Sequence, residues 1–164
     1  MNSITEITSG KERFMELLLI GDEQEDMVMK YLDRGRLFVK TADSVPCAVC
    51  VVTDEGSDTL EVKNIAVLPQ YQRCGIGREM LEFIQNRFAG RYKRLILGTG
   101  DSPLTVPFYE KCGFRKYDVI KNFFIDNYDH PIIEAGVQLC DMICFEKELS
   151  EYYETDREGI AEIW

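Results

Sequence analysis

The sequence lacks any apolar run long enough to cross a membrane, and it contains one histidine among its 164 residues. A membrane-spanning helix needs about 20 mostly apolar residues in succession. Residues 1–6, Met-Asn-Ser-Ile-Thr-Glu, also lack the charged and apolar regions of a secretory signal peptide. We therefore expect a cytoplasmic protein that has no membrane partner.

Positive charge is also scarce in this chain. Lysine and arginine number 19 against 29 aspartate and glutamate residues, which gives a net charge of −10. A surface of this sign repels the phosphates of nucleic acids and anionic lipids, so we expect neither as a partner. Acidic residues are concentrated at positions 22–26 and in the tail, residues 150–164, which we expect to be a solvated helix or a dimer contact.

The six cysteines do not have the pattern of a metal site. Cys47 and Cys50 have CxxC spacing, but they fall in the apolar run 47–52, which is typical of a buried strand. Side chains three apart on a strand point to opposite faces, whereas a zinc or redox pair needs a turn or a helix start. We expect these cysteines to pack in the core. Because His130 is the one imidazole, we predict no metal site.

The most informative segment is residues 60–88. Apolar side chains largely alternate along residues 60–67, as in a half-buried strand, and they recur at helical spacing after Gly77. Between the two patterns, the sequence Gln-Arg-Cys-Gly-Ile-Gly at residues 72–77 predicts a tight turn at a helix start. Uncovered N–H groups and the helix dipole favour an anion there, and a phosphate group is the expected ligand.

Two common nucleotide-binding motifs are absent from this segment. A Walker loop requires Gly-Lys-Ser/Thr, but Gly77 is followed by Arg78, and a Rossmann fingerprint requires a third glycine where Met80 stands. Arg73 and Arg78 could each contact a phosphate or be a solvated charge at the helix start. Cys74 could be a thiol of lowered pKa, or a position at which only the backbone N–H matters.

The other predicted elements describe a single α/β domain, residues 1–149, followed by the acidic tail. We expect strands at residues 3–8, 37–41, 47–53, 60–67, 94–99, 114–124 and 138–148, and helices near residues 14–19, 27–32 and 75–88, with a short helix that ends at Cys112.

Two motifs resemble the GNAT N-acetyltransferase superfamily. The pattern Val-x-Pro-x-x-Gln-x-x-Gly-Ile-Gly at residues 67–77 is similar to its central motif, and Phe-Tyr-Glu-Lys-Cys-Gly-Phe at residues 108–114 is similar to its second motif. The order of elements agrees along residues 4–149, and residues 123–136 resemble a subgroup of small bacterial members. The resemblance implies the GNAT acyl-CoA N-acyltransferase fold: a mixed, mostly antiparallel seven-stranded sheet with about four helices, here followed by a C-terminal helical tail.

The resemblance also implies acetyl-CoA as the cosubstrate. In the family, the glycine loop holds the pyrophosphate, and two splayed strands, here residues 60–67 and 94–99, accommodate pantetheine. Members often have an asparagine at the start of the short helix, which residues 100–105 lack, with Asp101 or Ser102 as possible substitutes. The implied acetyl-CoA-binding residues are Ile65, Ala66, Val67, Gln72, Arg73, Cys74, Gly75, Ile76, Gly77, Arg78 and Ser102.

The resemblance assigns catalytic roles to two residues. Tyr109 matches the tyrosine that donates its proton to the coenzyme A sulfur, although a tyrosine between two phenylalanines could also be plain core. Glu61 matches the glutamate base of histone-type members, although it could instead bind the substrate cation or face solvent. A backbone N–H near residues 65–67, where the family has a strand bulge, would stabilise the oxyanion.

The acceptor amine would enter between two acidic loops, residues 22–26 and 126–130, which would attract a cation. Candidate acceptor contacts are Glu25, Asp126 and Asp129. We expect an acetyl-CoA-dependent N-acetyltransferase that acts on a small cationic amine or a peptide amine by direct attack in a ternary complex. The alternative is an acyl-CoA-binding regulatory or interaction module without turnover. Homodimers are common in the family, and the last strands and the tail are the candidate surface.

Overall fold

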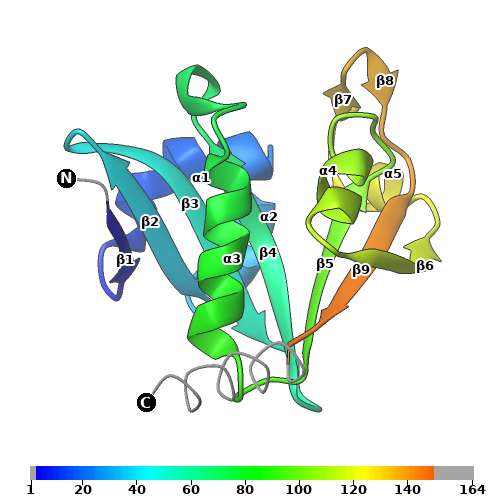
Figure 1. The fold of residues 1–164 in the computed structure, drawn as a ribbon. Coiled ribbons are helices and arrows are strands. Elements are labelled where there is room, and N and C mark those ends of the chain that lie inside the picture. The colour runs from blue at the N-terminus through cyan, green and yellow to red at the C-terminus, as the bar shows by residue number, and fades with distance from the viewer. Residues whose placement is uncertain (1–2, 150–164) are drawn as a thin grey trace.

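The computed structural model describes residues 3–149, which form a seven-stranded sheet with helices on both faces (Figure 1). The strands of this sheet are β1 (Ser3–Ile7), β2 (Arg36–Ala42), β3 (Val45–Asp54), β4 (Thr59–Val67), β5 (Arg94–Gly100), β6 (Arg115–Ile120) and β9 (Met142–Glu148). A separate hairpin consists of β7 (Ile133–Glu134) and β8 (Val137–Gln138). The helices are α1 (Met15–Gly21), α2 (Glu25–Leu32), α3 (Ile76–Phe88), α4 (Val106–Lys111) and α5 (Phe123–Asn127), with short 3₁₀ turns at Lys11–Phe14 and Pro69–Tyr71.

No helix in this described part of the chain is long and apolar enough to span a membrane. The predicted helical tail, residues 150–164, lies outside the described residues.

The sheet has the order β1-β2-β3-β4-β5-β9-β6, and neighbouring strands are antiparallel except for β4 and β5. A parallel pair requires a crossover connection, which α3 provides. β4 and β5 pair only over residues 59–62 and 94–97 and then separate. The α/β class and the mixed, mostly antiparallel sheet of seven strands confirm the prediction, and the separation leaves an opening in the middle of the sheet.

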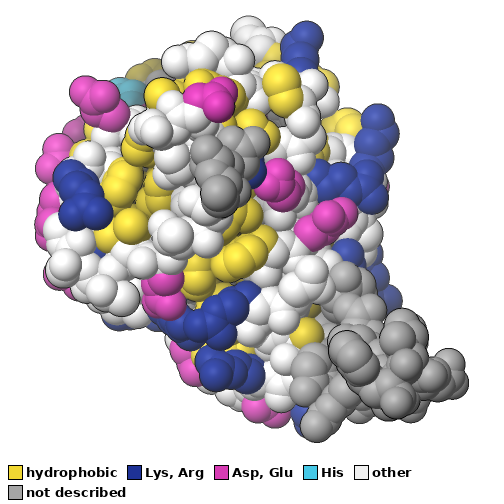
Figure 2. Space-filling view, turned by 60° about the vertical axis from the view of Figure 1, so that its left-hand side comes forward, with side chains coloured by type: hydrophobic (Ala, Val, Ile, Leu, Met, Phe, Trp, Pro, Cys, Tyr) yellow, Lys and Arg dark blue, Asp and Glu magenta, His cyan; other side chains and the backbone are white. Residues whose placement is uncertain are grey.

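Two hydrophobic clusters lie on opposite faces of the sheet. Helix α3 contributes Met80, Ile84 and Phe88, which its helical spacing places on one side and which are fully buried. Helices α1 and α2 contribute Leu18 and Leu32 to the other cluster. Charged side chains of both signs surround the apolar ones that remain on the surface (Figure 2). The two cores hold the sheet from both sides.

β4 contains a bulge at Lys63, which has no partner on β3 because the register of the pair shifts by one residue there. An extra residue reverses the alternation of side chains along a strand. Val62 therefore packs in the core beneath α3, whereas Asn64 turns toward α1 and donates to the Leu18 carbonyl at 2.8 Å. The family resemblance predicted a bulge near residues 65–67, and the structure has it two residues earlier.

Cys47 and Cys50 are both buried in the core beneath α3, as predicted, but they do not lie on opposite faces. A register shift between Lys40 and Thr41 of β2 makes Cys47 an extra residue in β3, so its side chain returns to the face of Cys50. Among residues 3–149, no group of His, Cys, Asp and Glu side chains is arranged to hold a metal ion.

The segment after β6 differs from the sequence prediction. One strand was expected over residues 114–124 and another from residue 138, but β6 ends at Ile120, and α5 and the β7–β8 hairpin precede β9. The Asp141 carboxylate accepts the backbone N–H of Asn122 at 2.9 Å, which stabilises the turn into α5. Cys140 consequently lies outside β9 and is exposed. This helix and hairpin form part of the site described next.

Candidate active site

A cavity of about 510 Å³ opens where β4 and β5 separate. Glu61 and Ile65 of β4 line one side, and residues 97–100 of β5 line the other. The α1–α2 loop, α4, α5 and the β7–β8 hairpin complete the wall. The cavity therefore joins the two strands that the sequence predicted to splay with the loops that it predicted to admit an acceptor.

The backbone of β4 is open toward this gap. Leu68 donates its N–H to the Cys47 carbonyl at 2.8 Å, and hydrogen bonding alternates along an antiparallel strand. Ala66 therefore faces β3, while Ile65 and Val67 direct their backbone groups toward the side that β5 has left. Of the three residues predicted to bind the cosubstrate, Ala66 thus pairs within the sheet and Ile65 has open backbone groups. Val67 has an open N–H, while its carbonyl accepts the Gln72 side chain.

The predicted anion loop lies at the start of α3. Arg73 and Gly75 have positive φ angles of 62° and 84°, and the first helical bond runs from the Glu79 N–H to the Gly75 carbonyl at 3.0 Å. The preceding N–H groups of a helix have no partner within it. A Cβ placed on Gly75 would have no atom within 4 Å, so space for a ligand lies directly above the helix start.

Neighbouring side chains hold this loop against the rest of the site. Gln72 donates from Nε2 to the Val67 carbonyl at 2.9 Å, which ties the loop to the end of β4. A Cβ on Gly77 would lie 3.2 Å from Cζ of Phe108, so the missing side chain leaves room for the ring of Phe108 beside the start of α3. The ring next to Tyr109 on α4 therefore reaches the glycine motif.

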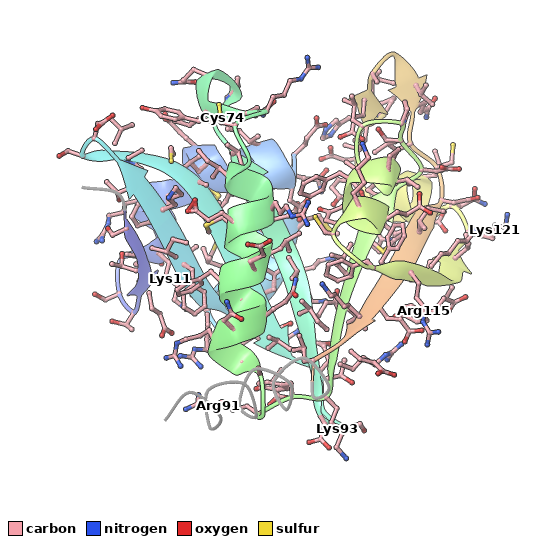
Figure 3. The ribbon with its side chains drawn as sticks, viewed as in Figure 1. Lys11, Cys74, Arg91, Lys93, Arg115 and Lys121 are labelled. Atoms are coloured by element: carbon pink, nitrogen blue, oxygen red, sulfur yellow. The ribbon has the colours of Figure 1, made fainter. Side chains whose placement is uncertain are left out.

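The charge around the loop suits an anion. Lys40, which is 5% exposed, binds the Glu79 carboxylate at 2.6 Å and neutralises it. Arg78 pairs with Glu82 at 3.2 Å, whereas Arg73 is exposed and has no acidic partner within 4.0 Å among residues 3–149. The exposed Cys74 stands in the loop above α3 (Figure 3).

Tyr109 of α4 is the acid candidate, and it faces the cavity although it is 8% exposed. The edges of its ring contact Phe108 and Phe114, with ring centroids 5.1 and 6.1 Å away. Its hydroxyl has no hydrogen-bond partner among the described residues. Burial raises the pKa of Tyr109 above the usual value of 10.0, which keeps the hydroxyl protonated at neutral pH. The arrangement offers a fixed, unengaged O–H donor.

Glu61 lies on β4 at the lower end of the cavity, where the strand still pairs with β5. Its Oε2 binds Nζ of Lys63 at 3.1 Å, and both side chains are about one quarter exposed. Lys63, the bulge residue of β4, also lines the cavity, so the ion pair between Glu61 and Lys63 lies in the cavity wall. One carboxylate oxygen is thus oriented by an ammonium group, and the other has no side-chain partner among the described residues.

A hydrogen-bonded chain joins the two loops on the acceptor side. Asn64 donates to the Tyr31 hydroxyl at 3.1 Å, Tyr31 donates to Asp22 at 2.9 Å, and Tyr128 donates to the other oxygen of Asp22 at 2.6 Å. Burial raises the pKa of Asp22, and the two hydroxyl donors oppose this rise. The Asp129 N–H adds a bond to the Gln24 side chain at 3.0 Å. The α1–α2 loop and the segment after α5 therefore form one rigid wall.

Several predicted contacts do not line the cavity. Glu25, Asp126 and Asp129 are exposed residues outside its wall. Ser102 is 2% exposed, and its hydroxyl accepts the Leu104 N–H in the turn before α4. Helix α4 begins only at Val106, four residues after Ser102. The cavity wall contains instead Asp22, Thr105 and Glu134. Asp22 lies within the predicted acidic segment, but nothing in the sequence indicated that two distant tyrosines would bind it.

Comparison with known proteins agrees with this geometry. A family model for the acetyltransferase (GNAT) domain matches residues 33–116. An uncharacterized N-acetyltransferase, YvbK of Bacillus subtilis (strain 168), is 33% identical over 134 residues, which are 80% of this chain and 86% of that protein.

Solved structures show the same fold. A GNAT family acetyltransferase from Elizabethkingia anophelis with acetyl-CoA bound has a TM-score of 0.86 at 35% identity, covering 90% of this chain and 98% of that one. An acetyltransferase of Bacillus subtilis in complex with CoA has a TM-score of 0.82 at 30% identity, covering 91% and 99%. This chain belongs to the GNAT acetyltransferase family, and its cosubstrate is acetyl-CoA.

Proposed function

We propose that the protein transfers the acetyl group of acetyl-CoA to a primary amine by direct attack in a ternary complex. The observation that carries this proposal is the cavity between β4 and β5, which is lined by Tyr109, Glu61 and Ile65 of the open strand edge. A donor, an acceptor and the groups that exchange their protons can meet in one space. The thioester supplies an acetyl group that is activated toward an amine nucleophile.

The donor end is supported by the loop at residues 72–77. Its uncovered N–H groups and Arg73 would bind the pyrophosphate, with no side chain at Gly75 to obstruct it. The open backbone groups of Ile65 and the open N–H of Val67 would bind the pantetheine arm, and an N–H at this edge would stabilise charge on the thioester oxygen. Thr105, rather than Ser102, reaches the cavity from the segment before α4.

The amine must lose a proton before or as it attacks. An alkylammonium group has a pKa near 10.4, so on the order of one molecule in a thousand is neutral at pH 7. We assign the proton to Glu61, directly or through a water molecule, with Lys63 orienting the carboxylate. The amine nitrogen forms the bond to the carbonyl carbon, the C–S bond breaks, and Tyr109 gives its proton to the departing sulfur.

Initial velocities with acetyl-CoA and a panel of amines, followed by thiol release, test the transfer. Direct attack predicts intersecting double-reciprocal lines, and it predicts no acetylated protein in the intact mass when the amine is omitted. Parallel lines or an acetylated cysteine would instead indicate a covalent intermediate. Binding of acetyl-CoA without release of thiol for any amine would support the alternative, an acyl-CoA-binding regulatory or interaction module.

The role of Glu61 has its own test. Glu61→Gln should lower kcat roughly 100-fold at pH 7, and the deficit should shrink toward pH 10, where neutral amine is abundant. Glu110→Gln, an exposed carboxamide substitution on α4, is the matched control and should leave kcat unchanged. A deficit of the same size at every pH would indicate that Glu61 only binds the substrate.

A homodimer and a cytoplasmic location stay predictions. The edge strand β6 supports a dimer contact, because Tyr117 on it is 41% exposed. Arg115 and Lys121 stand on the same side of the molecule (Figure 3). Light scattering of the purified protein measures the mass directly, and a monomer at micromolar concentration would contradict the dimer.

A further inference from the structure

Three aromatic side chains of the cavity are not explained by the catalytic groups or by the cores. Phe123, Phe124 and Tyr128 come from α5 and the residue after it, and all three line the cavity. Each is half-buried, and none packs in either hydrophobic cluster of the sheet. Packing of the fold therefore does not account for this group of rings, which we call the aromatic shelf.

The shelf is preorganised. Phe124 and Tyr128 are stacked with centroids 5.7 Å apart and planes inclined by 21°, and Phe123 packs edge-on against Phe124 at 5.2 Å. The Tyr128 hydroxyl is fixed by Asp22 at 2.6 Å. At the other end of the shelf, the Phe124 N–H donates to the Cys140 carbonyl at 2.9 Å, which holds α5 beside the upper end of β9 (Figure 1).

The side chains opposite the shelf extend the apolar surface. Ile20 and Ile120 line the cavity although each is at least 40% exposed, and Met27 reaches it from α2. Exposed apolar side chains that gather at a cavity mouth are typical of a ligand-binding wall. This end of the space is therefore suited to a flat apolar group rather than to a chain of charges.

The charges at the cavity disfavour a polycation. Lys30, Arg34 and Lys63 all line it, and Lys30 has no acidic partner within 4.0 Å in the described part of the chain. Of the acids, Glu61 is paired with Lys63, Asp22 accepts the two tyrosine hydroxyls, and Glu23 is an exposed residue of the α1–α2 loop. The unpaired Lys30 would repel a second ammonium group on the acceptor, so an acceptor with one positive charge fits this space.

Glu134 supplies the carboxylate for that single charge. It comes from the β7–β8 hairpin, lines the cavity and has no ion-pair or hydrogen-bond partner among residues 3–149. It is also close enough to Tyr109 to affect the pKa of the phenol through its charge. An ammonium group placed between Glu134 and Tyr109 would extend its substituent toward the shelf.

We infer that the acceptor is a monoamine whose amino group is attached through a short linker to an aromatic ring, and that the ring stacks on Phe123, Phe124 and Tyr128. This inference rests on the proposed function, because it names the acceptor of the same reaction. Ring stacking and burial of one phenyl group are expected to raise kcat/KM by roughly 10- to 100-fold over an alkylamine of equal charge.

Kinetics with three probes test the inference: 2-phenylethylamine, n-butylamine and spermidine. We expect kcat/KM for 2-phenylethylamine to exceed both others at least about 10-fold. Phe124→Ala should remove this preference, because it should lower kcat/KM for 2-phenylethylamine at least about 10-fold more than kcat/KM for n-butylamine. Ile125→Ala, on the same helix but 47% exposed and outside the cavity, is the matched control and should retain the preference.

Equal kcat/KM for the three amines, or a preference for spermidine, would overturn the inference while the proposed function stands. Should no amine be acetylated, the proposed function fails, and saturation-transfer NMR of 2-phenylethylamine with the CoA-loaded protein then tests the shelf by itself. Transfer to the ring protons that Phe124→Ala abolishes supports the shelf, and no transfer overturns it. Phe124→Leu, which keeps an apolar side chain at this position, replaces the alanine variant if that protein does not fold.

Discussion

Replacing Tyr109 by phenylalanine separates the contribution of its hydroxyl to catalysis from the contribution of its ring to packing. The ring packs edge-on against Phe108 and Phe114, at 5.1 and 6.1 Å between centroids, and phenylalanine keeps these contacts. The hydroxyl has no partner in the described part of the chain, so its removal leaves no buried group unsatisfied. We expect the free energy of unfolding to change by less than about 1 kcal/mol.

Catalysis should change far more than stability. Loss of a positioned general acid costs between about 100- and 10,000-fold. We expect a loss at the lower end of this range, because a thiol has a pKa near 8.5 and its thiolate can leave without prior protonation. A 100-fold fall in kcat corresponds to about 2.7 kcal/mol in the activation free energy. KM for acetyl-CoA should stay within about threefold, since the pyrophosphate loop is untouched.

The pH dependence gives the sharper test. Burial raises the pKa of Tyr109 above 10.0, so the acid is protonated throughout an assay from pH 7 to pH 9.5. The ratio of wild-type to variant kcat should then stay constant over this range. Tyr117→Phe, at an exposed tyrosine of β6, is the control and should match the wild type. An unchanged kcat for Tyr109→Phe would refute the proton-donor role, whereas a ratio that falls as pH rises toward 9.5 would contradict the raised pKa of Tyr109.

Three further predictions follow from single contacts. Gly75→Asp should weaken acetyl-CoA binding at least about tenfold by calorimetry, because it adds charge and bulk at the loop, whereas Gly56→Asp, also at positive φ with open space but in the β3–β4 turn, should not. Gly21→Ala would place a Cβ 2.2 Å from Oδ1 of Asn64, so urea unfolding should show a loss of about 1–3 kcal/mol, and a neutral result would contradict the packing. Arg36 of β2 binds Glu6 at 2.7 Å and lowers the pKa of this carboxyl below 4.5. The stabilisation that the ion pair gives to the folded state is therefore present above pH 4.5 and disappears as the pH falls through the lowered pKa. Glu6→Gln should therefore cost under about 1 kcal/mol at pH 7 and less at pH 3, and an equal cost at both values would contradict the ion pair.

The donor half of the site was predictable from the sequence because it depends on local backbone geometry. The glycines at residues 75 and 77 require a turn at a helix start, and the alternating pattern before them requires a strand. The glycine after Cys112 marked the end of the short helix that carries Tyr109. In each of these cases, residues only a few positions apart in the sequence determine the local structure.

The acceptor half was not predictable because it depends on contacts between distant segments. Asp22 and Tyr128 are 106 positions apart, and neither residue type indicates the other as its partner. The acidic loops suggested a cationic acceptor; Asp22 and Glu23 of the first loop line the cavity, but Glu25 and Asp126 lie outside it. The position of the bulge at Lys63 was not predictable for the same reason, because it depends on how β4 pairs with β3. This one unpaired residue decides which side chains of β4 face α1.

The central claim is that this cavity passes the acetyl group from acetyl-CoA to an amine. The most direct measurement is mass spectrometry of 2-phenylethylamine, n-butylamine and spermidine after incubation with the protein and acetyl-CoA, with released thiol quantified in the same sample. The account predicts one added acetyl group per thiol released, abolished or strongly reduced in Tyr109→Phe. Thiol release with no acetylated amine, or acetylation that is the same in Tyr109→Phe, would contradict it.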